Sequence, residues 1–407
     1  MSDSRGGAHA PKHAAPKKDS ESSGHIKLTS EPLRTPAAPV KKEKKRKKGR
    51  PRTGKIALCV VLFLLLLVLA LVIFVSQKLG KIDYSDGKIS QIIPGILDKD
   101  EDEGELVDIS GLEMVEPTAL PEGDIVSDKN VFNILLLGTD DRDLQFSEDA
   151  RADSIMLLSL NFKEGTGKLV SFERGMGVPI LSGPYAGQYD WITHCFRYGG
   201  ADLMLQEIRE CFKVDVQHYM RVNLNALIKV VDALGGIDVE LTKTEAWYLN
   251  ASVTGGNFGG YASGNIYRGD WTSEVQSDLK EGMNHLTGAM AVGYARLRAI
   301  DSDWQRIVRQ RTVIQACADS LKSADLLTLN RVADEVLPLV QTNLSQTEIL
   351  GLMVKAPSML GIVFDQMTIP ADGTYGGMTG MEGRGMFWPD FEVNIQILHD
   401  FIYGKKA

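Results

Sequence analysis

Cysteine is scarce in this 407-residue chain, and its placement excludes two kinds of stabilised domain. Cys59 lies within a long apolar run, Cys195, Cys211 and Cys317 follow that run, and no two of the four have C-x-x-C spacing. The three later cysteines therefore form neither a disulfide framework nor a zinc site. A Cys195–Cys211 bridge and buried free thiols both stay open.

Familiar hydrolase motifs are also missing. The sequence contains no H-E-x-x-H motif, and no Ser-His-Asp or Cys-His arrangement can be read from its spacing. It therefore gives no support to a metalloprotease or a triad hydrolase.

Residues 1–55 have almost no aromatic or β-branched residues. They carry 16 Lys+Arg against 5 Asp+Glu, a net charge of +11, whereas the whole chain has a net charge of −8. This composition predicts a disordered basic tail. The Lys-rich run at 41–48 lacks a recognition helix and interleaved aromatics, so we expect no nucleic-acid binding. The run is typical of a topology signal that contacts anionic membrane lipid.

Long apolar runs occur once. The 20 residues from 56 to 75 (IALCVVLFLLLLVLALVIFV) carry no charge and are long enough, at about 1.5 Å per residue, to cross a bilayer. A cleaved signal peptide would be shorter and end in a small-residue site. We expect a transmembrane helix over residues 56–76, with the tail in the cytoplasm and the rest outside the cell membrane. Residues 77–129 are acidic and are expected to form an extracytoplasmic stalk with little structure of its own.

Three short apolar runs, at 131–137, 154–160 and 168–172, predict consecutive strands. Short connections favour an antiparallel meander. Such a meander would bring Asp140, Asp153 and Arg174 to one end of the sheet. Taken singly, each residue is equally explained as a turn residue, a cap or half of a surface ion pair, for example between Arg151 and Asp153.

A second charged cluster lies near residue 300. Alternation in residues 294–298 (YARLR) predicts an extended segment with Arg296 and Arg298 on one face. A helix at 304–318 would place Arg306 and Gln310 in one stripe, with Arg309 to the side. Guanidinium groups match phosphate oxygens in a bidentate manner, so the cluster indicates a phosphate site. A solvated, salt-bridged surface is the alternative.

These segments together resemble the LytR-CpsA-Psr family. The resemblance covers roughly residues 131–320 and rests on blocks in the family order: 133–140 (NILLLGTD), 151–157 (RADSIML), 198–201 (YGGA), 231–239 (VDALGGIDV), 286–288 (LTG), 294–298 (YARLR) and 301–310 (DSDWQRIVRQ). It implies an α/β fold with a mixed, largely antiparallel central sheet between helices and a lipid-binding tunnel. The apolar helical stripes at 201–212 and 222–234 would line the tunnel or fill a core. Residues 130–320 would form the catalytic domain, and residues 321–407 would complete it.

The resemblance also implies an activity and a set of site residues. Family members are membrane-anchored bacterial phosphotransferases, which move a glycopolymer such as teichoic acid or capsule polysaccharide from a polyprenyl-pyrophosphate carrier to a peptidoglycan acceptor. By resemblance, Asp140 and Asp153 hold Mg²⁺. The residues that bind the pyrophosphate would be Arg174, Arg296, Arg298, Arg306 and Gln310. Asp140, Asp153 and Arg174 would be catalytic, and the general base is undecided between the two aspartates.

Two segments depart from the family pattern. The family reads S-I-P-R-D-T where this chain has S-F-E-R-G-M at 171–176, so Arg174 is kept and Glu173 and Gly175 are changed. Residues 191–196 (WITHCF) replace the usual I-N-A-A-Y. These changes motivate a second hypothesis, a non-catalytic protein that binds polyprenyl-linked glycan as a sensor or scaffold. A tethered transcription regulator is a poorer third.

Overall fold

The computed structural model describes residues 66, 69–89, 107–141, 146–148, 150–253, 257–258, 261–262, 278–297, 300, 303–355 and 362–404. The chain divides into two units, Met1–Leu62 and Phe63–Ala407, and every described residue belongs to the second. The basic tail, most of the expected span and Arg298 lie outside the described residues. Among the residues that are described, no helix has the length and apolar character needed to cross a membrane.

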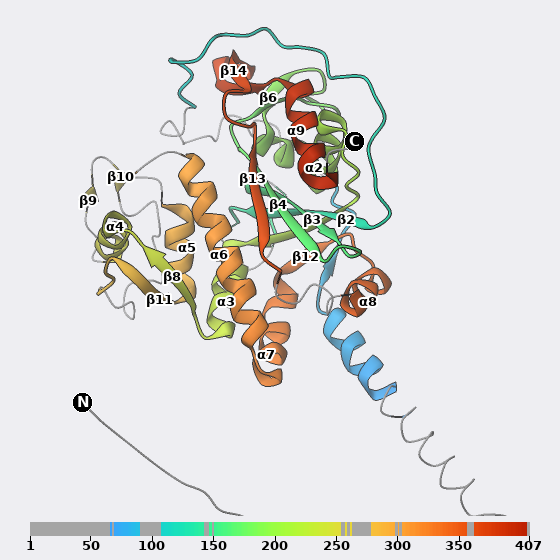
Figure 1. The fold of residues 1–407 in the computed structure, drawn as a ribbon, viewed down its shortest axis with the longest axis vertical. Helices are drawn as coiled ribbons and strands as arrows, with labels where there is room; N and C mark the ends of the chain where they lie inside the picture. The colour runs from blue at the N-terminus through green and yellow to red at the C-terminus, as the bar shows by residue number, and fades with distance from the viewer. Residues whose placement is uncertain are drawn as a thin grey trace, which may run out of the picture. The chain divides into compact units, whose positions relative to one another are not determined.

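A mixed sheet forms the centre of the second unit (Figure 1). In spatial order, the strands described are β1 (Asp83–Tyr84), β12 (Val340–Thr342), β7 (His218–Asn223), β2 (Val131–Thr139), β3 (Ala152–Asn161), β4 (Thr166–Phe172) and β13 (Phe364–Ile369). The β1–β12, β7–β2 and β4–β13 pairs are parallel, and the three other pairs are antiparallel. The central sheet is therefore mixed, as expected. Among the described strands only half of the pairs are antiparallel, because strands from distant parts of the chain join the meander on both sides.

The meander itself is confirmed. Strand β2 pairs antiparallel with β3, and β3 pairs antiparallel with β4. Near the end of β2 the register shifts: Gly138 pairs with Ser154 and Thr139 pairs with Ala152. Asp153 is thus the extra residue of a bulge, a feature that commonly re-aims a side chain beside a functional site.

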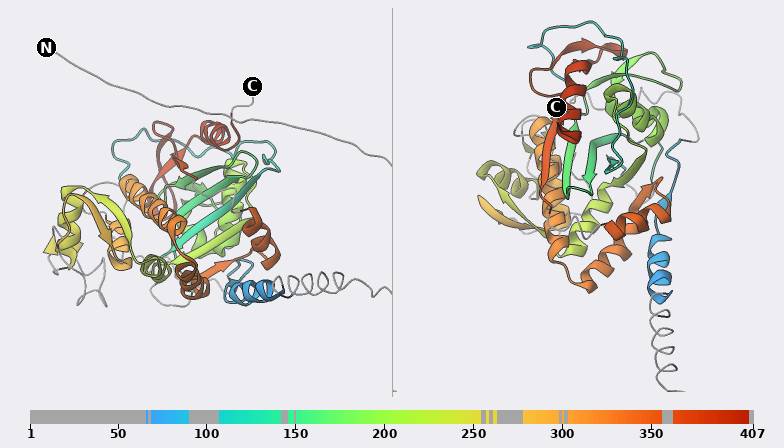
Figure 2. Two further views of the ribbon diagram at one scale, coloured as in Figure 1. Left: turned by 60° about the horizontal axis from the view of Figure 1, so that its bottom comes forward. Right: turned by 45° about the vertical axis from the view of Figure 1, so that its right-hand side comes forward.

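One face of the sheet is sealed by helices α2 (Ile192–Phe212) and α9 (Phe391–Tyr403). Leu135, Leu157 and Phe172 are buried there against Phe196 and Phe212. Helices α3 (Leu224–Leu234) and α6 (Asp303–Ser323) lie on the other side of the sheet (Figure 2). The expected helix from residue 222 begins two residues later, because Val222 and Asn223 finish β7.

A second apolar cluster joins α3, α4, α5, α6 and a two-stranded antiparallel sheet. Its elements and their neighbours are β8 (Ile237–Leu241), α4 (Lys243–Val253), β9 (Asn257–Phe258), β10 (Tyr261–Ala262), β11 (Gly282–Leu286) and α5 (Gly288–Arg296). Helix α5 includes Arg296 as its last residue. The expected extended conformation of residues 294–298 is therefore wrong for residues 294–296. Three alternating side chains are too few to separate a strand from the last turn of a helix.

The segment expected to be an unstructured stalk contributes to the fold. A helix at residues 69–79 leads into β1, which joins the central sheet. Farther along, Glu113 and Val115 form backbone hydrogen bonds with Gly377 in the hairpin of β14 (Tyr375–Thr379) and β15 (Gly385–Pro389). Backbone pairing with the body thus orders parts of an acidic, polar stretch.

The remaining elements are shorter. They are β5 (Gly177–Pro179), β6 (Tyr189–Trp191), α7 (Leu326–Val336), η3 (Leu337–Leu339), α8 (Gln346–Lys355) and η5 (Met381–Gly383). Cys195, Cys211 and Cys317 are buried free thiols, so the Cys195–Cys211 bridge left open by the sequence is absent among the described residues.

Candidate active site

Two carboxylates meet at the end of β2 and the start of β3. Asp140 directly follows β2, and its Oδ1 accepts the backbone N–H of Arg151 at 2.8 Å while its Oδ2 accepts from Nε of Arg151 at 3.2 Å. Burial and repulsion from the charge of Asp153 raise the pKa of Asp140, and the contacts with Arg151 oppose this. Arg151 therefore pairs with Asp140.

Arg174 completes this group. Nη1 of Arg174 lies 3.5 Å from Oδ1 of Asp153, and the arginine side chain is buried. The N–H of Thr193 donates to the carbonyl of Arg174 at 3.4 Å, and Oγ1 of Thr193 donates to the carbonyl of Ala152 at 2.7 Å. The first turn of α2 thus joins the ends of β3 and β4. The structure brings Asp140, Asp153 and Arg174 together as the meander predicted.

Glu173 has a defined place beside Arg174. Its buried carboxylate accepts the backbone N–H of Gly175. A Cβ atom at position 175 would lie 3.5 Å from Oε2 of Glu173 and would overlap Cγ2 of Val107. Residue 175 is therefore a glycine because Val107 occupies the space of its side chain. The carboxylate of Glu173 therefore lies close to the point from which the side chain of a larger residue at position 175 would extend.

The N-terminal end of α6 is connected to the same turn through aromatic rings. Trp304 stacks on Tyr375 at 5.8 Å between centroids and packs on Phe387 at 6.0 Å. The N–H of Phe387 donates to the carbonyl of Gly175 at 3.1 Å. The β14–β15 hairpin therefore contacts both the turn that contains Arg174 and the first turn of α6.

Of the other predicted site residues, Arg298 lies outside the described residues, and the rest lie on α5 and α6. Arg306 is buried two residues after Trp304, Gln310 is half-buried one turn later, and Arg296 is half-buried at the end of α5. Arg309 serves another purpose: its Nε donates to Oε1 of Glu245 at 2.7 Å.

Comparison with known proteins adds to this geometry. The LytR_cpsA_psr family model matches residues 99–385, which is well over half of the chain. The chain belongs to the LytR-CpsA-Psr family. The match begins within the segment that was expected to be a stalk and extends beyond the expected end of the catalytic domain, in agreement with the ordered segments there.

Two relatives and one solved structure illustrate the similarity. Polyisoprenyl-teichoic acid–peptidoglycan teichoic acid transferase TagU of Bacillus anthracis is 30% identical over 254 residues, 62% of this chain and 73% of TagU. TagT of Bacillus subtilis, with the same transferase name, is 29% identical over 243 residues, 59% of this chain and 68% of TagT. A structure of TagT bound to LIIa-WTA is 26% identical with a TM-score of 0.51, covering 67% of this chain and 90% of that one.

The residues of this family member fit the magnesium ion that the resemblance implies. Mg²⁺ is usually held by one or two carboxylates together with water and phosphate oxygens. Asp140 and Asp153 are close enough for their charges to raise the pKa of Asp140, and a cation would relieve that repulsion. Within the described ranges there is no group of three or more His, Cys, Asp or Glu residues that could hold a metal.

Sequence reasoning missed Arg221, a buried arginine next to the site. Its Nη2 donates to both carboxylate oxygens of Asp141 at 2.9 Å, and its Nε donates to Oγ1 of Thr139 at 3.0 Å. The guanidinium lies between the rings of Phe146 and Phe196, 4.6 and 4.7 Å from their centroids. The available signal was a charged residue in β7 that alternates with Tyr219 and Asn223 on one face of the strand.

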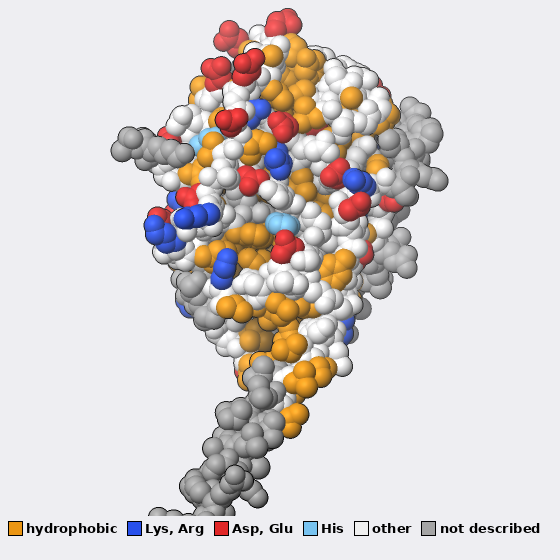
Figure 3. Space-filling model, turned by 90° about the vertical axis from the view of Figure 1, so that its right-hand side faces the viewer, with side chains coloured by type: hydrophobic (Ala, Val, Ile, Leu, Met, Phe, Trp, Pro, Cys, Tyr) orange, Lys and Arg blue, Asp and Glu red, His pale blue; other side chains and the backbone are white. Residues whose placement is uncertain are grey.

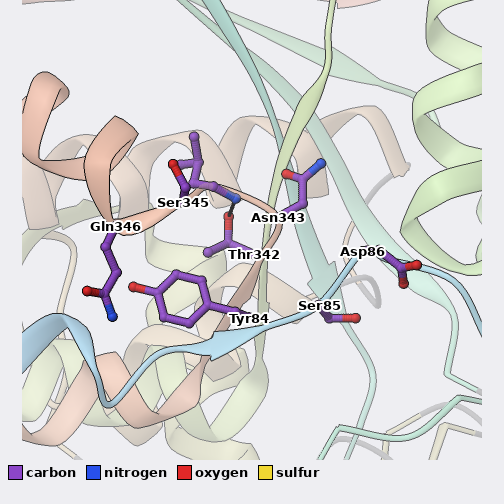
Figure 4. Close-up of a pocket in the computed structure, with 8 residues that line it drawn as sticks. Tyr84, Ser85, Asp86, Thr342, Asn343, Ser345 and Gln346 are labelled. Atoms are coloured by element: carbon purple, nitrogen blue, oxygen red, sulfur yellow. Dashed lines mark hydrogen bonds between the residues drawn. The ribbon is translucent and has the colours of Figure 1, made fainter.

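A cavity of about 490 Å³ lies at the other end of the sheet (Figure 4). It is lined by Tyr84, Ser85, Asp86, Thr342, Asn343, Leu344, Ser345 and Gln346. Thr342 pairs with Met220, whereas Asn223 pairs with Thr139 beside the carboxylates. The register thus separates this cavity from the candidate active site.

Proposed function

We propose that this chain transfers a glycopolymer from a polyprenyl-pyrophosphate carrier to peptidoglycan. The observation that carries the proposal is the convergence of Asp140, Asp153 and Arg174 at one end of the sheet in a member of this family. The names of the TagU and TagT relatives support the same reaction class. An acceptor hydroxyl on peptidoglycan attacks the phosphorus next to the glycan, polyprenyl phosphate leaves, and a phosphodiester forms.

Charge stabilisation is the main contribution of the protein in such a phosphoryl transfer. The guanidinium of Arg174 is held in place by Asp153, so it needs little reorganisation to bind a phosphate oxygen. Arg296, Arg298, Arg306 and Gln310 are proposed to bind the rest of the pyrophosphate. Bound Mg²⁺ would offset phosphate charge, with Asp140 and Asp153 as its protein ligands. Either aspartate could accept the proton of the attacking hydroxyl.

An apolar channel over one face of the sheet is the proposed site of the polyprenyl chain. Leu135 and Leu157, on the face against α2, are fully buried. On the opposite face of the same strands, Leu136 and Leu158 are only half-buried, although both strands are central. Leucines that keep part of their surface accessible inside a sheet sandwich suit an isoprenoid ligand.

The location we propose is the outer face of a bacterial cell membrane, with residues 56–76 as a single-pass anchor and the basic tail inside on anionic lipid. The sheet register supports this. Pairing runs from Leu137 in β2 through Arg221 in β7 and Gln341 in β12 to Asp83 in β1, so the residues before β1 lead toward the end of the sheet that holds Asp140. Three strand spacings separate β1 from β2, or about 14 Å. The helix at 69–79 would thus bring the site close to the bilayer surface.

The test is transfer by the purified full chain in vesicles that contain a polyprenyl-pyrophosphate glycan, with peptidoglycan fragments and Mg²⁺ added. We expect phosphodiester-linked product from the wild type and a strong loss in Asp153→Asn. A chain that retains the lipid-linked glycan without turnover under these conditions would favour the alternative, a non-catalytic sensor or scaffold. The departures at Glu173 and Gly175 are the observation that keeps this alternative in view.

A further inference from the structure

The turn between α6 and α7 carries an exposed group of leucines, which we name the leucine tip. It consists of Leu321, Leu326, Leu327 and Leu329. Leu326 and Leu327 are 83% and 80% exposed, although they are neighbours in the first turn of a helix. Paired exposed leucines at the end of a helical hairpin indicate a surface that contacts something apolar.

Helix α7 is held by a capping hydrogen bond and by contacts with the rest of the unit. The side chain of Asp325 caps its N-terminus by accepting the N–H of Thr328 at 2.7 Å. Nε of Arg331 donates to the carbonyl of Ala233 at 3.0 Å, and Val336 is buried. The body thus holds α7 along its length and presents the leucine tip outward.

The same helix is attached to the segment that leads out of the expected membrane span. Asp334 accepts from Nζ of Lys78 at 2.5 Å and from Nζ of Lys81 at 2.6 Å. Leu79 and Val336 are buried in one shared cluster. In Figure 1 and the right-hand view of Figure 2, α7 and the helix at 69–79 both lie at the lower end of the body.

The helix at 69–79 has an apolar surface of its own. Leu71, Val72, Ile73 and Phe74, all within the 20-residue apolar run, are about half exposed. Figure 3 shows hydrophobic side chains gathered at this lower end of the molecule. The chain also places Lys322, a cation suited to lipid phosphate, beside Leu321 at the turn.

We propose that the leucine tip docks into the outer leaflet of the membrane in which residues 56–76 are anchored. The occupant is lipid: acyl chains against the four leucines and anionic headgroups near Lys322. Docking at a second point would fix the tilt of the body and hold the sheet end with Asp140 and Asp153 at the height of a lipid pyrophosphate. This inference rests on the anchoring part of the proposed function.

The test places an environment-sensitive fluorophore on the full chain. Leu327→Cys is labelled with a nitrobenzoxadiazole probe and reconstituted in phosphatidylcholine–phosphatidylglycerol nanodiscs, one chain per disc, with and without spin-labelled lipid. The matched control is Val393→Cys, an exposed apolar position on α9, and this helix lies near the opposite end of the body in Figure 1. Unmodified chain corrects for labelling at the native cysteines.

We expect blue-shifted emission that spin-labelled lipid quenches at position 327, and water-like, unquenched emission at position 393. Equal emission at both positions would overturn the docking proposal. A blue shift at 327 that spin-labelled lipid does not quench, and that appears only with two chains per disc, would also overturn it in favour of a second copy. Co-flotation of the chain with vesicles, and transfer activity on the same sample, report separately on the anchor and on the enzyme.

Discussion

Nη1 of Arg174 lies 3.5 Å from Oδ1 of Asp153, although β3, β4 and the turn between them separate the two residues in the chain. The aspartate is the extra residue of a bulge, and the arginine is the second residue after its strand ends at Phe172. Each side chain therefore leaves the regular alternation of its strand at the same end of the sheet. This pairing holds the buried guanidinium in place before any substrate binds.

We expect Arg174→Ala to lower the transfer rate by about 10²–10³, as for the loss of one preorganised donor. Arg174→Lys keeps the charge but loses the planar guanidinium group, so its transfer rate should lie between those of the wild type and Arg174→Ala. Arg209→Ala is the matched control, because Arg209 also faces an aspartate, Asp215 at 3.7 Å, but on the surface. The measurement is transfer from a lipid-linked donor by folded variants. Similar rates for R174A and R209A would contradict the assigned role.

A second prediction concerns the acid beside Arg174. Glu173→Gln keeps an acceptor for the N–H of Gly175 but removes a buried charge, and we expect transfer to fall by about tenfold, or ~1.4 kcal/mol. Adding Gly175→Asp together with Val107→Ala should restore part of this loss, because a side chain at 175 begins 3.5 Å from Oε2 of Glu173 once Val107 is shortened. The control is V107A alone. Transfer by E173Q at the wild-type rate would show that the charge at this place has no role, and failure of the folded triple variant to exceed E173Q would show that an acid at 175 does not replace it.

The third prediction concerns Trp304 as a positioning residue. Trp304→Ala removes the stacking on Tyr375 and frees the first turn of α6, which carries Arg306. We expect KM for the lipid-linked donor to rise by about tenfold, with Trp304→Phe recovering most of it, since an aromatic contact contributes roughly 0.5–1.5 kcal/mol. Trp247→Ala, at an exposed tryptophan of α4, is the control. An unchanged KM in W304A would show that the contact between the β14–β15 hairpin and α6 does not position the donor site.

The order of the meander could be predicted because short turns leave adjacent strands little choice but antiparallel pairing. The place of β7 beside β2 could not be predicted in this way. The two strands pair in parallel, and their pairing depends on how α2, which precedes β7, packs on the face of the sheet. The contact of Trp304 with Tyr375 was equally hidden, because it depends on how a hairpin near the C-terminus folds back. Arg296 shows the other limit: a five-residue alternation is compatible with both an extended segment and the last turn of a helix.

The Arg221–Asp141 pair gives a fourth prediction. Replacing Arg221 with Met leaves the buried carboxylate of Asp141 without its bidentate partner, and we expect the free energy of unfolding to drop by about 3–5 kcal/mol. The double variant R221M/D141N should lose less than the sum of the single losses, because no unpaired charge is left inside. The exposed Arg209–Asp215 pair should cost at most about 1 kcal/mol in the same cycle. Urea unfolding measures each value, and additive losses for R221M and D141N would contradict the coupling.

Glu207 on α2 is a carboxyl inside the apolar core. It accepts the N–H of Leu181 at 2.8 Å and the thiol of Cys211 at 3.8 Å, and burial raises its pKa to about 8. In the unfolded chain the same carboxyl ionises near its ordinary value of about 4.3. Between these two values the folded state keeps a proton that the unfolded state has released.

The sign of the pH dependence follows from this difference. Stability from neutral Glu207 is complete below the unfolded pKa and is lost as pH rises through the folded value, because the buried group must then ionise. We expect the free energy of unfolding of the wild type to fall between about pH 4.5 and 8 relative to Glu207→Gln, which stays neutral with the same shape, by at most about 5 kcal/mol. Urea unfolding of both proteins at half-unit pH steps cancels the contributions of all other groups. Parallel stability curves would show that Glu207 is already ionised in the folded core, and a wild-type curve that rises relative to E207Q would reverse the sign derived from its burial.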